Sequence, residues 1–265
     1  MVDPFVTLNV EPAYRKVAAT LIEHITAGTL KQGERLPAEI ELARRLGVHR
    51  STVREALREL ESAGLLRRER GSKLMMVSRP DQRVVAKGVS RALTLHQATV
   101  AEVWEAMTVL EPVLAELAAR RRDETSLQAM TESLALGAPT DTVQAAAHAA
   151  EFFRLLAAAA GNSVLALSQE PLLQLLDSSL RRMIEIVPQA RSRIATAQRR
   201  IVEAIERGDA VAARSWCEKH IRDYRRGFEI ANIDLALPIN APASRGRPSV
   251  SSYRNTAKRS ARSTK

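Results

Sequence analysis

Between positions 50 and 58, four hydrogen-bond donors recur at spacings of three and four residues: Arg50, Ser51, Arg54 and Arg58. At helical spacing they share one face. Guanidinium forks beside a hydroxyl can bind base edges and phosphates in the major groove of DNA. Three carboxylates lie close by, at Glu55, Glu59 and Glu61, so a solvated helix face with ordinary ion pairs is the alternative.

This face needs a short helix held against other helices. Apolar residues at helical spacing predict helices over 14–27, 38–46 and 49–62, and Gly47 separates the last two. Two short helices around a glycine turn indicate a helix-turn-helix. Two short strands are predicted next, with a turn at 70–72 and basic residues around it. We expect this hairpin to be a wing whose tip touches the minor groove or the backbone, through Arg70, Gly71 and Lys73.

The charge of the chain is concentrated at its two ends. The 265 residues carry a net charge of +10, divided as +4 over 1–79, −1 over 80–237 and +7 over 238–265. A basic head, a neutral middle and a basic tail are typical of a DNA-binding domain followed by a ligand or dimer domain. The tail has few apolar residues and is expected to be disordered. It is either a solvated end without a role or a nonspecific attractor of phosphates.

Several classes of protein are disfavoured. A single cysteine excludes an internal disulfide framework and a cysteine-rich zinc site. The chain has no apolar run of membrane-spanning length, and its first ten residues do not resemble a signal peptide. We find no glycine-rich phosphate loop and no nucleophile elbow. We therefore expect a bacterial cytoplasmic, DNA-associated protein that is not an enzyme, has no cofactor and does not bind membranes.

The middle of the chain is predicted to be entirely helical. Amphipathic stretches cover 83–95, 98–121, 124–136, 141–160, 163–186, 189–207 and 209–231, with Gly, Pro, Asn or Asp between most of them. No alternation typical of strands occurs there. A bundle of six or seven helices follows from this pattern.

The first eighty residues resemble a known family. The run LPAEIELARRLGVHRSTVREALRELESAGL is similar to the winged-helix domain of GntR-family transcription regulators, over about 12–77. The resemblance implies DNA contacts by the start of the second helix of the motif and by the wing tip, at His49, Arg50, Ser51, Thr52, Arg54 and Gly71. Family members often have a DNA-contacting Arg where this chain has Ile40. They also have Ser or Thr, which are good N-caps, at position 49. We expect His49 to cap poorly and to contact DNA instead.

Residues 87–230 resemble the FCD ligand-binding domain of the FadR subfamily, through Leu110-Glu111-Pro112, Ala159-Ala160-Gly161-Asn162 and the run 201–209. Many members hold a divalent metal there through one Asp and three His. Those positions fall on Ala149, Phe153, Gln198 and His220, so one ligand of four is retained and no metal is expected. A relocated site built from His148, Glu151 and His220 is the alternative.

The same resemblance places an effector pocket at Met107, Phe153, Gln198 and His220. Met107 stands where an Arg that can pair with a carboxylate is common. The pocket is therefore expected to be less polar than usual and to take an apolar or acyl-type effector. A collapsed pocket without an effector is the alternative.

Together these observations predict a mainly α protein with a winged helix-turn-helix domain at 11–78, a linker at 79–88, an FCD-like effector and dimerisation bundle at 89–232 and a basic tail at 238–265. The expected function is a homodimeric transcription regulator, most often a repressor in this family, that binds a palindromic double-stranded DNA operator. A regulator without an effector and a nonspecific DNA-organising protein remain as alternatives.

Overall fold

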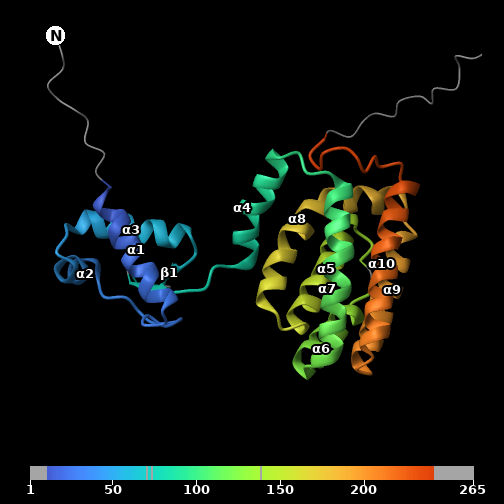
Figure 1. Cartoon of the computed structure of the whole chain (residues 1–265), viewed down its shortest axis with the longest axis horizontal. Coiled ribbons are helices and arrows are strands. Elements are labelled where there is room, and N and C mark those ends of the chain that lie inside the picture. The colour runs from blue at the N-terminus through green and yellow to red at the C-terminus, as the bar shows by residue number, and fades with distance from the viewer. Residues whose placement is uncertain (1–10, 70, 73, 138, 242–265) are drawn as a thin grey trace, which may run out of the picture. The chain divides into compact units, whose positions relative to one another are not determined.

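The structure is a computed structural model that describes residues 11–69, 71–72, 74–137 and 139–241. The chain forms two compact units, one made of residues up to 91 together with 166–174, the other of 92–165 and 175 onward. The fold is mainly α, as predicted. In the described part of the chain, three helices and a hairpin are followed by seven further helices (Figure 1). None of these helices is long and apolar enough to cross a membrane.

The N-terminal unit contains a winged helix-turn-helix. Helices α1 (Ala13–Thr26), α2 (Glu39–Leu46) and α3 (Arg50–Ser62) precede strands β1 (Leu66–Arg68) and β2 (Met75–Val77). The strands are antiparallel, with Leu66 opposite Val77. Gly47 closes α2 with a φ of 64°, a left-handed conformation that glycine adopts without strain. That turn sets the direction of α3.

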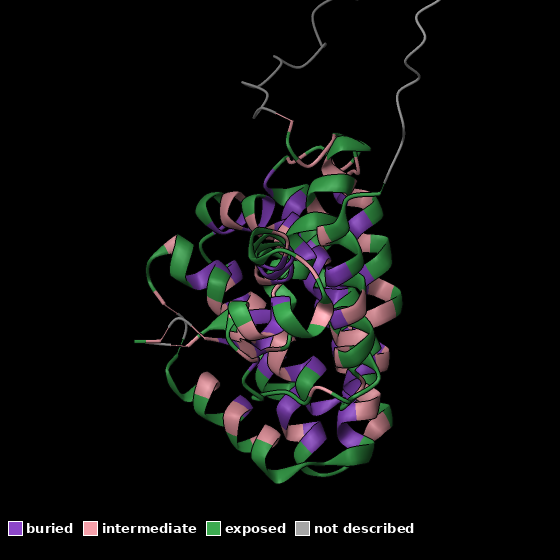
Figure 2. Ribbon diagram, turned by 90° about the vertical axis from the view of Figure 1, so that its left-hand side faces the viewer, coloured by how far each residue is buried: buried purple, intermediate pink, exposed green. Residues whose placement is uncertain are grey.

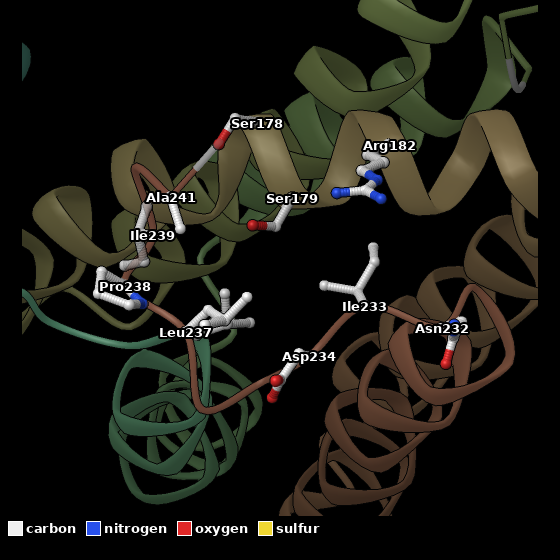
Figure 3. Close-up of a pocket in the computed structure, with 11 residues that line it drawn as sticks. Ser178, Ser179, Arg182, Asn232, Ile233, Asp234, Leu237, Pro238, Ile239 and Ala241 are labelled. Atoms are coloured by element: carbon white, nitrogen blue, oxygen red, sulfur yellow. The ribbon is translucent and has the colours of Figure 1, made fainter. Parts of the chain in front are cut away.

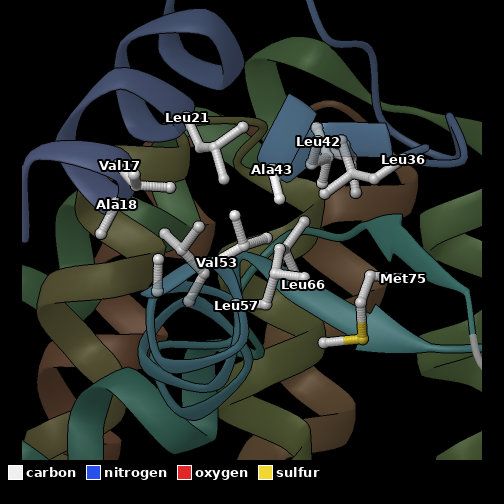
Figure 4. Packing of buried hydrophobic residues seen from close by; sticks show 13 residues of the cluster. Val17, Ala18, Leu21, Leu36, Leu42, Ala43, Val53, Leu57, Leu66 and Met75 are labelled. Carbon is white, nitrogen blue, oxygen red and sulfur yellow. The ribbon is translucent and has the colours of Figure 1, made fainter. Parts of the chain in front are cut away.

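One apolar cluster holds the winged domain together (Figure 4). Leu21 of α1, Ala43 of α2 and Leu57 of α3 meet there, and Leu66 and Met75 bring in both strands. Ala43 is small where the two helices of the motif approach each other closely. Because α3 buries Val53, Ala56, Leu57 and Leu60 in this cluster, its opposite face is left to solvent.

Seven helices follow the wing: α4 (Gln82–Leu95), α5 (Val100–Arg121), α6 (Glu124–Ala135), α7 (Thr142–Ala159), α8 (Ser163–Ile186), α9 (Ala190–Glu206) and α10 (Ala210–Ile230). Most begin at a residue that satisfies the unpaired N–H groups of the first turn. Thr99 and Glu102 form a reciprocal capping box at α5. Asp, or Asn in one case, caps α6, α7, α8 and α10, through Asp123, Asp141, Asn162 and Asp209. Helix α4 begins within the segment 79–88 that was expected to be a linker.

The bundle is built around α10, which packs along α5 and α9. Figure 2 shows the buried residues on the inner sides of the helices. The indole of Trp104 on α5 donates a hydrogen bond to the carbonyl of Ile221 on α10, at 2.9 Å. The Arg225 guanidinium lies 4.8 Å from the centre of that ring, and the Lys219 ammonium lies 4.8 Å from the ring of Trp216. The two tryptophans of the chain are therefore each covered by a cation of α10.

After α10 the chain forms a segment that we call the C-terminal strap, residues 232–241. Its backbone bonds to the turn before α5 and to the first turn of that helix. The Ile239 N–H donates to the Ala98 carbonyl at 3.0 Å, and the Leu235 carbonyl accepts from the Ala101 N–H at 2.9 Å. Residues 238–241 of the predicted tail thus lie in defined structure. The rest of that tail lies outside the described residues.

Candidate nucleic-acid interface and bundle interior

The predicted DNA-reading face of α3 is exposed. His49, Arg50, Ser51, Arg54 and Arg58 are open to solvent, and Thr52 is half-buried. Arg58 forms no ion pair with another described residue. Of the predicted wing-tip residues, Gly71 has a φ of 74°, whereas Arg70 and Lys73 lie outside the described residues. The structure therefore brings the helix donors together and leaves two of the three wing residues untested.

His49 caps α3, which corrects the expectation of a poor cap. Its Nδ1 accepts from the Ser51 N–H at 3.3 Å and lies 2.7 Å from the Ser51 hydroxyl. An imidazole nitrogen accepts a hydrogen bond only when it carries no proton, so this cap uses the unprotonated Nδ1. The expectation was wrong because it considered only side-chain oxygens as cap acceptors.

A carboxylate that sequence reasoning missed binds both of the predicted reading arginines. Glu39, the first residue of α2, accepts from Arg50 Nε at 2.9 Å and from Arg54 Nη2 at 3.4 Å, both at its Oε2. The Glu39 side chain is 29% exposed, and those of Arg50 and Arg54 are 52% and 46% exposed. Each guanidinium therefore keeps donors directed to solvent while one edge is fixed.

The electrostatics of Glu39 keep this clamp ionised. Partial burial raises the pKa of Glu39, but the hydrogen bond from Arg50 and the charges of Arg54 and Arg50 outweigh it, so the pKa lies below the ordinary value. The signal available in the sequence was an acidic residue in the first turn of α2. Its partners are eleven and fifteen residues away, and only the crossing of the two helices brings them together.

Ile40 stands beside this clamp and is 66% exposed. It occupies the position where the resemblance placed a DNA-contacting Arg. A large apolar side chain open to solvent next to the reading arginines can contact a thymine methyl but cannot bind a phosphate. The interface therefore has one cation fewer than the resemblance would supply.

In the bundle, the predicted effector pocket is filled by its own side chains. Met107, Phe153, Gln198 and His220 are each at most 3% exposed. The rings of Phe153 and His220 stack, with centres 5.5 Å apart. His220 borders a cavity of about 30 Å³ between α8, α9 and α10, which can hold little more than a water molecule. Met107, Phe153 and Gln198 do not line it.

Several buried polar atoms in this interior lack a hydrogen-bond partner among the described residues: both amide atoms of Gln198, His220 Nε2 and the Tyr224 hydroxyl. Burial lowers the pKa of His220 to about 3, so its ring is neutral at pH 7. Burial also raises the pKa of Tyr224, and the nearby Glu111 and Cys217 add to the effect. The pKa of the Cys217 thiol is raised well above its ordinary value by burial and by the charges of Glu111 and Glu218. The His220 imidazole, the Tyr224 hydroxyl and the Cys217 thiol are therefore all uncharged at pH 7.

Within the described residues, no group of three or more His, Cys, Asp or Glu side chains is placed to hold a metal ion. The alternative metal site that the sequence offered, built from His148, Glu151 and His220, is therefore not formed among these residues. His148 Nε2 lies 2.8 Å from the Ser133 carbonyl, so that nitrogen donates and cannot ligate. Ala149 and Phe153 offer no ligand atom at all.

Comparisons with known proteins agree with this architecture. Residues 13–74 match the gntR family of bacterial regulatory proteins, and residues 102–223 match the FCD domain. The HTH-type transcriptional regulator Mce2R of Mycobacterium tuberculosis is 28% identical over 241 residues, which cover 89% of this chain and 95% of that protein. An uncharacterized HTH-type regulator of the same species is 32% identical, over 57% of this chain. That match spans 63% of the relative's length, and one with a Bacillus subtilis regulator spans 66%.

The fold also has a solved counterpart. A GntR protein of Streptococcus agalactiae superposes with a TM-score of 0.58 and 27% identity, covering 80% of this chain and 99% of the other. These families consist of regulators and not of enzymes. With a gntR-type helix-turn-helix followed by an FCD domain, the chain belongs to the gntR family of bacterial regulatory proteins.

Proposed function

We propose that this protein is a cytoplasmic, DNA-associated transcription regulator that acts as a homodimer on a palindromic operator, and as a repressor. The observation that carries the proposal is the exposed face of α3. Arg50 and Arg54 stand one turn apart at the N-terminal end of a helix whose other face is buried, and Glu39 fixes both guanidinium groups. Such a pair can bind two guanine edges in a major groove.

Sequence-specific DNA binding is favoured over nonspecific DNA organisation by the same clamp. A phosphate-binding surface needs only mobile cations, whereas reading bases needs donors held in a fixed orientation. Two copies related by a two-fold axis would present two α3 helices to two half-sites. This geometry is the reason for proposing a palindrome.

The test is selection of bound duplexes from a random DNA pool by the full-length protein, followed by affinity measurement on the selected and a scrambled duplex. We expect a palindromic site, bound by two chains. Arg50→Ala and Arg54→Ala should each cost about 1–3 kcal/mol on the selected site. Arg120→Ala, which removes an exposed charge from α5, is the matched control and should leave the affinity unchanged. Selected and scrambled duplexes bound with equal affinity would contradict sequence-specific regulation and support the DNA-organising alternative.

Whether the protein represses or activates transcription is tested by a separate reporter assay. A reporter gene placed behind the selected site should be expressed less when the protein is present, because a dimer bound at a promoter excludes polymerase. Activation of the reporter would contradict the repressor assignment while leaving operator binding intact.

We also propose that a small, largely apolar effector modulates this affinity. The predicted residues Met107 and Phe153 make the bundle interior apolar, but that interior is packed and borders a cavity of only about 30 Å³. An effector that enters there has to displace the Phe153 ring from His220. The alternative, a regulator without an effector, predicts that operator affinity does not change with any metabolite.

A further inference from the structure

A second and larger hollow lies in the bundle unit, between α8 and the C-terminal strap (Figure 3). Its volume is about 210 Å³, and the first turn of α5 closes one side. It is separate from the residues that the family resemblance assigned to an effector. Three segments that are far apart in the sequence form its walls.

The wall formed by α8 is polar. Ser179 is only 9% exposed, and its hydroxyl has no hydrogen-bond partner among the described residues. Arg182 lies three residues later and forms no ion pair with any described residue. Figure 3 shows the Ser179 oxygen and the Arg182 guanidinium on the side of α8 that faces the strap. Both groups therefore direct hydrogen-bond donors into the cavity, where a bound ligand can replace water as their acceptor.

The neighbouring arginine differs from Arg182, because it has an ion-pair partner within α8. Arg181, also half-buried, binds the Asp177 carboxylate on the same helix at 2.6 Å. Arg182 forms no such pair with any described residue, although Glu185 lies three residues later on the same helix. The one acidic residue that lines the cavity, Asp234, accepts from the Ala236 N–H at 3.0 Å, and in Figure 3 its oxygens point away from α8.

The opposite wall is apolar. The strap contributes Ile233, Leu237 and Ile239, and the start of α5 contributes Val100. A ligand that fits both walls has an anionic head of two or more oxygens and a short hydrocarbon body. A guanidinium binds such a head by two parallel hydrogen bonds, and the Ser179 hydroxyl supplies a third donor.

We propose that this cavity binds a small organic carboxylate, with the carboxylate on Arg182 and Ser179 and the hydrocarbon body against the strap. Bound there, the ligand bridges α8 and the strap, whose backbone bonds reach Ala98 and Ala101. Ala98 belongs to the turn that joins α4 to α5. Binding itself does not depend on the regulatory role, whereas any effect on DNA rests on the function proposed above.

The test is isothermal titration calorimetry of the full-length protein with hexanoate, without DNA. We expect saturable binding that Arg182→Gln weakens at least tenfold and Ser179→Ala weakens severalfold. Arg181→Gln is the matched control, since it removes the same charge one residue away, and it should bind as the wild type does. Inorganic phosphate lacks the hydrocarbon body and 1-hexanol lacks the charge, so each should bind at least tenfold more weakly than hexanoate.

Three results would overturn the proposal: no saturable binding of hexanoate, equal dissociation constants for Arg182→Gln and the wild type, or equal binding of 1-hexanol and hexanoate. If Arg182→Gln does not fold, Arg182→Lys keeps the charge but loses the fork, and it should still weaken binding. Operator affinity is measured separately on the ligand-free wild type. A missing carboxylate site and a missing operator are therefore distinct outcomes.

Discussion

Glu39 illustrates how a residue that is repelled by DNA can favour its recognition. In the proposed complex its negative charge would be brought close to phosphates, which opposes binding to any sequence. It also fixes Arg50 and Arg54, which favours only those sequences whose base edges meet the fixed donors. Affinity for random DNA and specificity thus depend on this side chain in opposite directions.

We therefore predict that Glu39→Gln lowers the ratio of operator affinity to random-DNA affinity by roughly fivefold, equivalent to about 1 kcal/mol, the value of a strong exposed ion pair. Affinity for random DNA should hold or rise, because an anion has been removed. Glu41→Gln is the control, because Glu41 binds Arg44 and Arg45 on its own helix instead. Competition assays on selected and scrambled duplexes measure both quantities. An unchanged ratio would mean that the clamp does not orient the arginines in the complex.

Replacing Ile40 tests whether an arginine at this position, which is common in the family, would contact DNA. Ile40→Arg should tighten binding to selected and scrambled DNA alike and steepen the dependence of log affinity on log salt by about 0.9 if one phosphate is met. Val109→Arg adds the same charge at an exposed position of α5 and should leave the slope as it is. A gain confined to the selected duplex would instead indicate that the new Arg reads a base.

At the scale of helices, α10 carries an unusual buried group. Burial lowers the pKa of His220 to about 3 from an ordinary value of 6.5. Between these values the unfolded chain binds a proton that the folded chain does not, so His220 destabilises the fold progressively as the pH falls below 6.5. At pH 7 the ring is neutral in both states and this contribution vanishes.

We predict that His220→Leu reduces the loss of unfolding free energy between pH 7 and pH 5 by about 2 kcal/mol relative to the wild type, from about 1.4 kcal/mol per pH unit below 6.5. Urea unfolding at both pH values measures the difference. Leucine has a similar volume and does not titrate. Equal acid sensitivity of the two proteins would show that His220 becomes accessible to protons without unfolding.

The helices were predictable from the sequence because their causes are local. Apolar spacing and the caps at Asp123, Asp141, Asn162 and Asp209 lie within a few residues of what they determine. The Glu39 clamp and the cavity at Arg182 were not predictable, because each depends on segments that meet only in the folded chain. The end of the strap, residues 238–241, is poor in large side chains and so resembles the tail that follows it. Backbone bonds to Ala98, which need no particular side chain, hold it in place.

For the whole molecule, the charge distribution gives the remaining prediction. The tail carries seven positive charges and no negative one. Deleting residues 242–265 removes all of them and leaves the strap in place. The slope of log affinity against log salt should become shallower by about 0.9 for each phosphate that the tail neutralises in the wild type. The thermal midpoint of the bundle should stay the same, and an unchanged slope would show that the tail takes no part in DNA binding.

The two tryptophans have a consequence for spectroscopy. Trp104 and Trp216 both belong to the bundle unit, each beneath a cation of α10, and the chain has no third. Intrinsic fluorescence excited at the red edge of absorption therefore comes from the FCD domain alone. The DNA-binding domain itself contains no indole. A change of emission on adding the operator therefore reports on the surroundings of the bundle, read without attaching a dye.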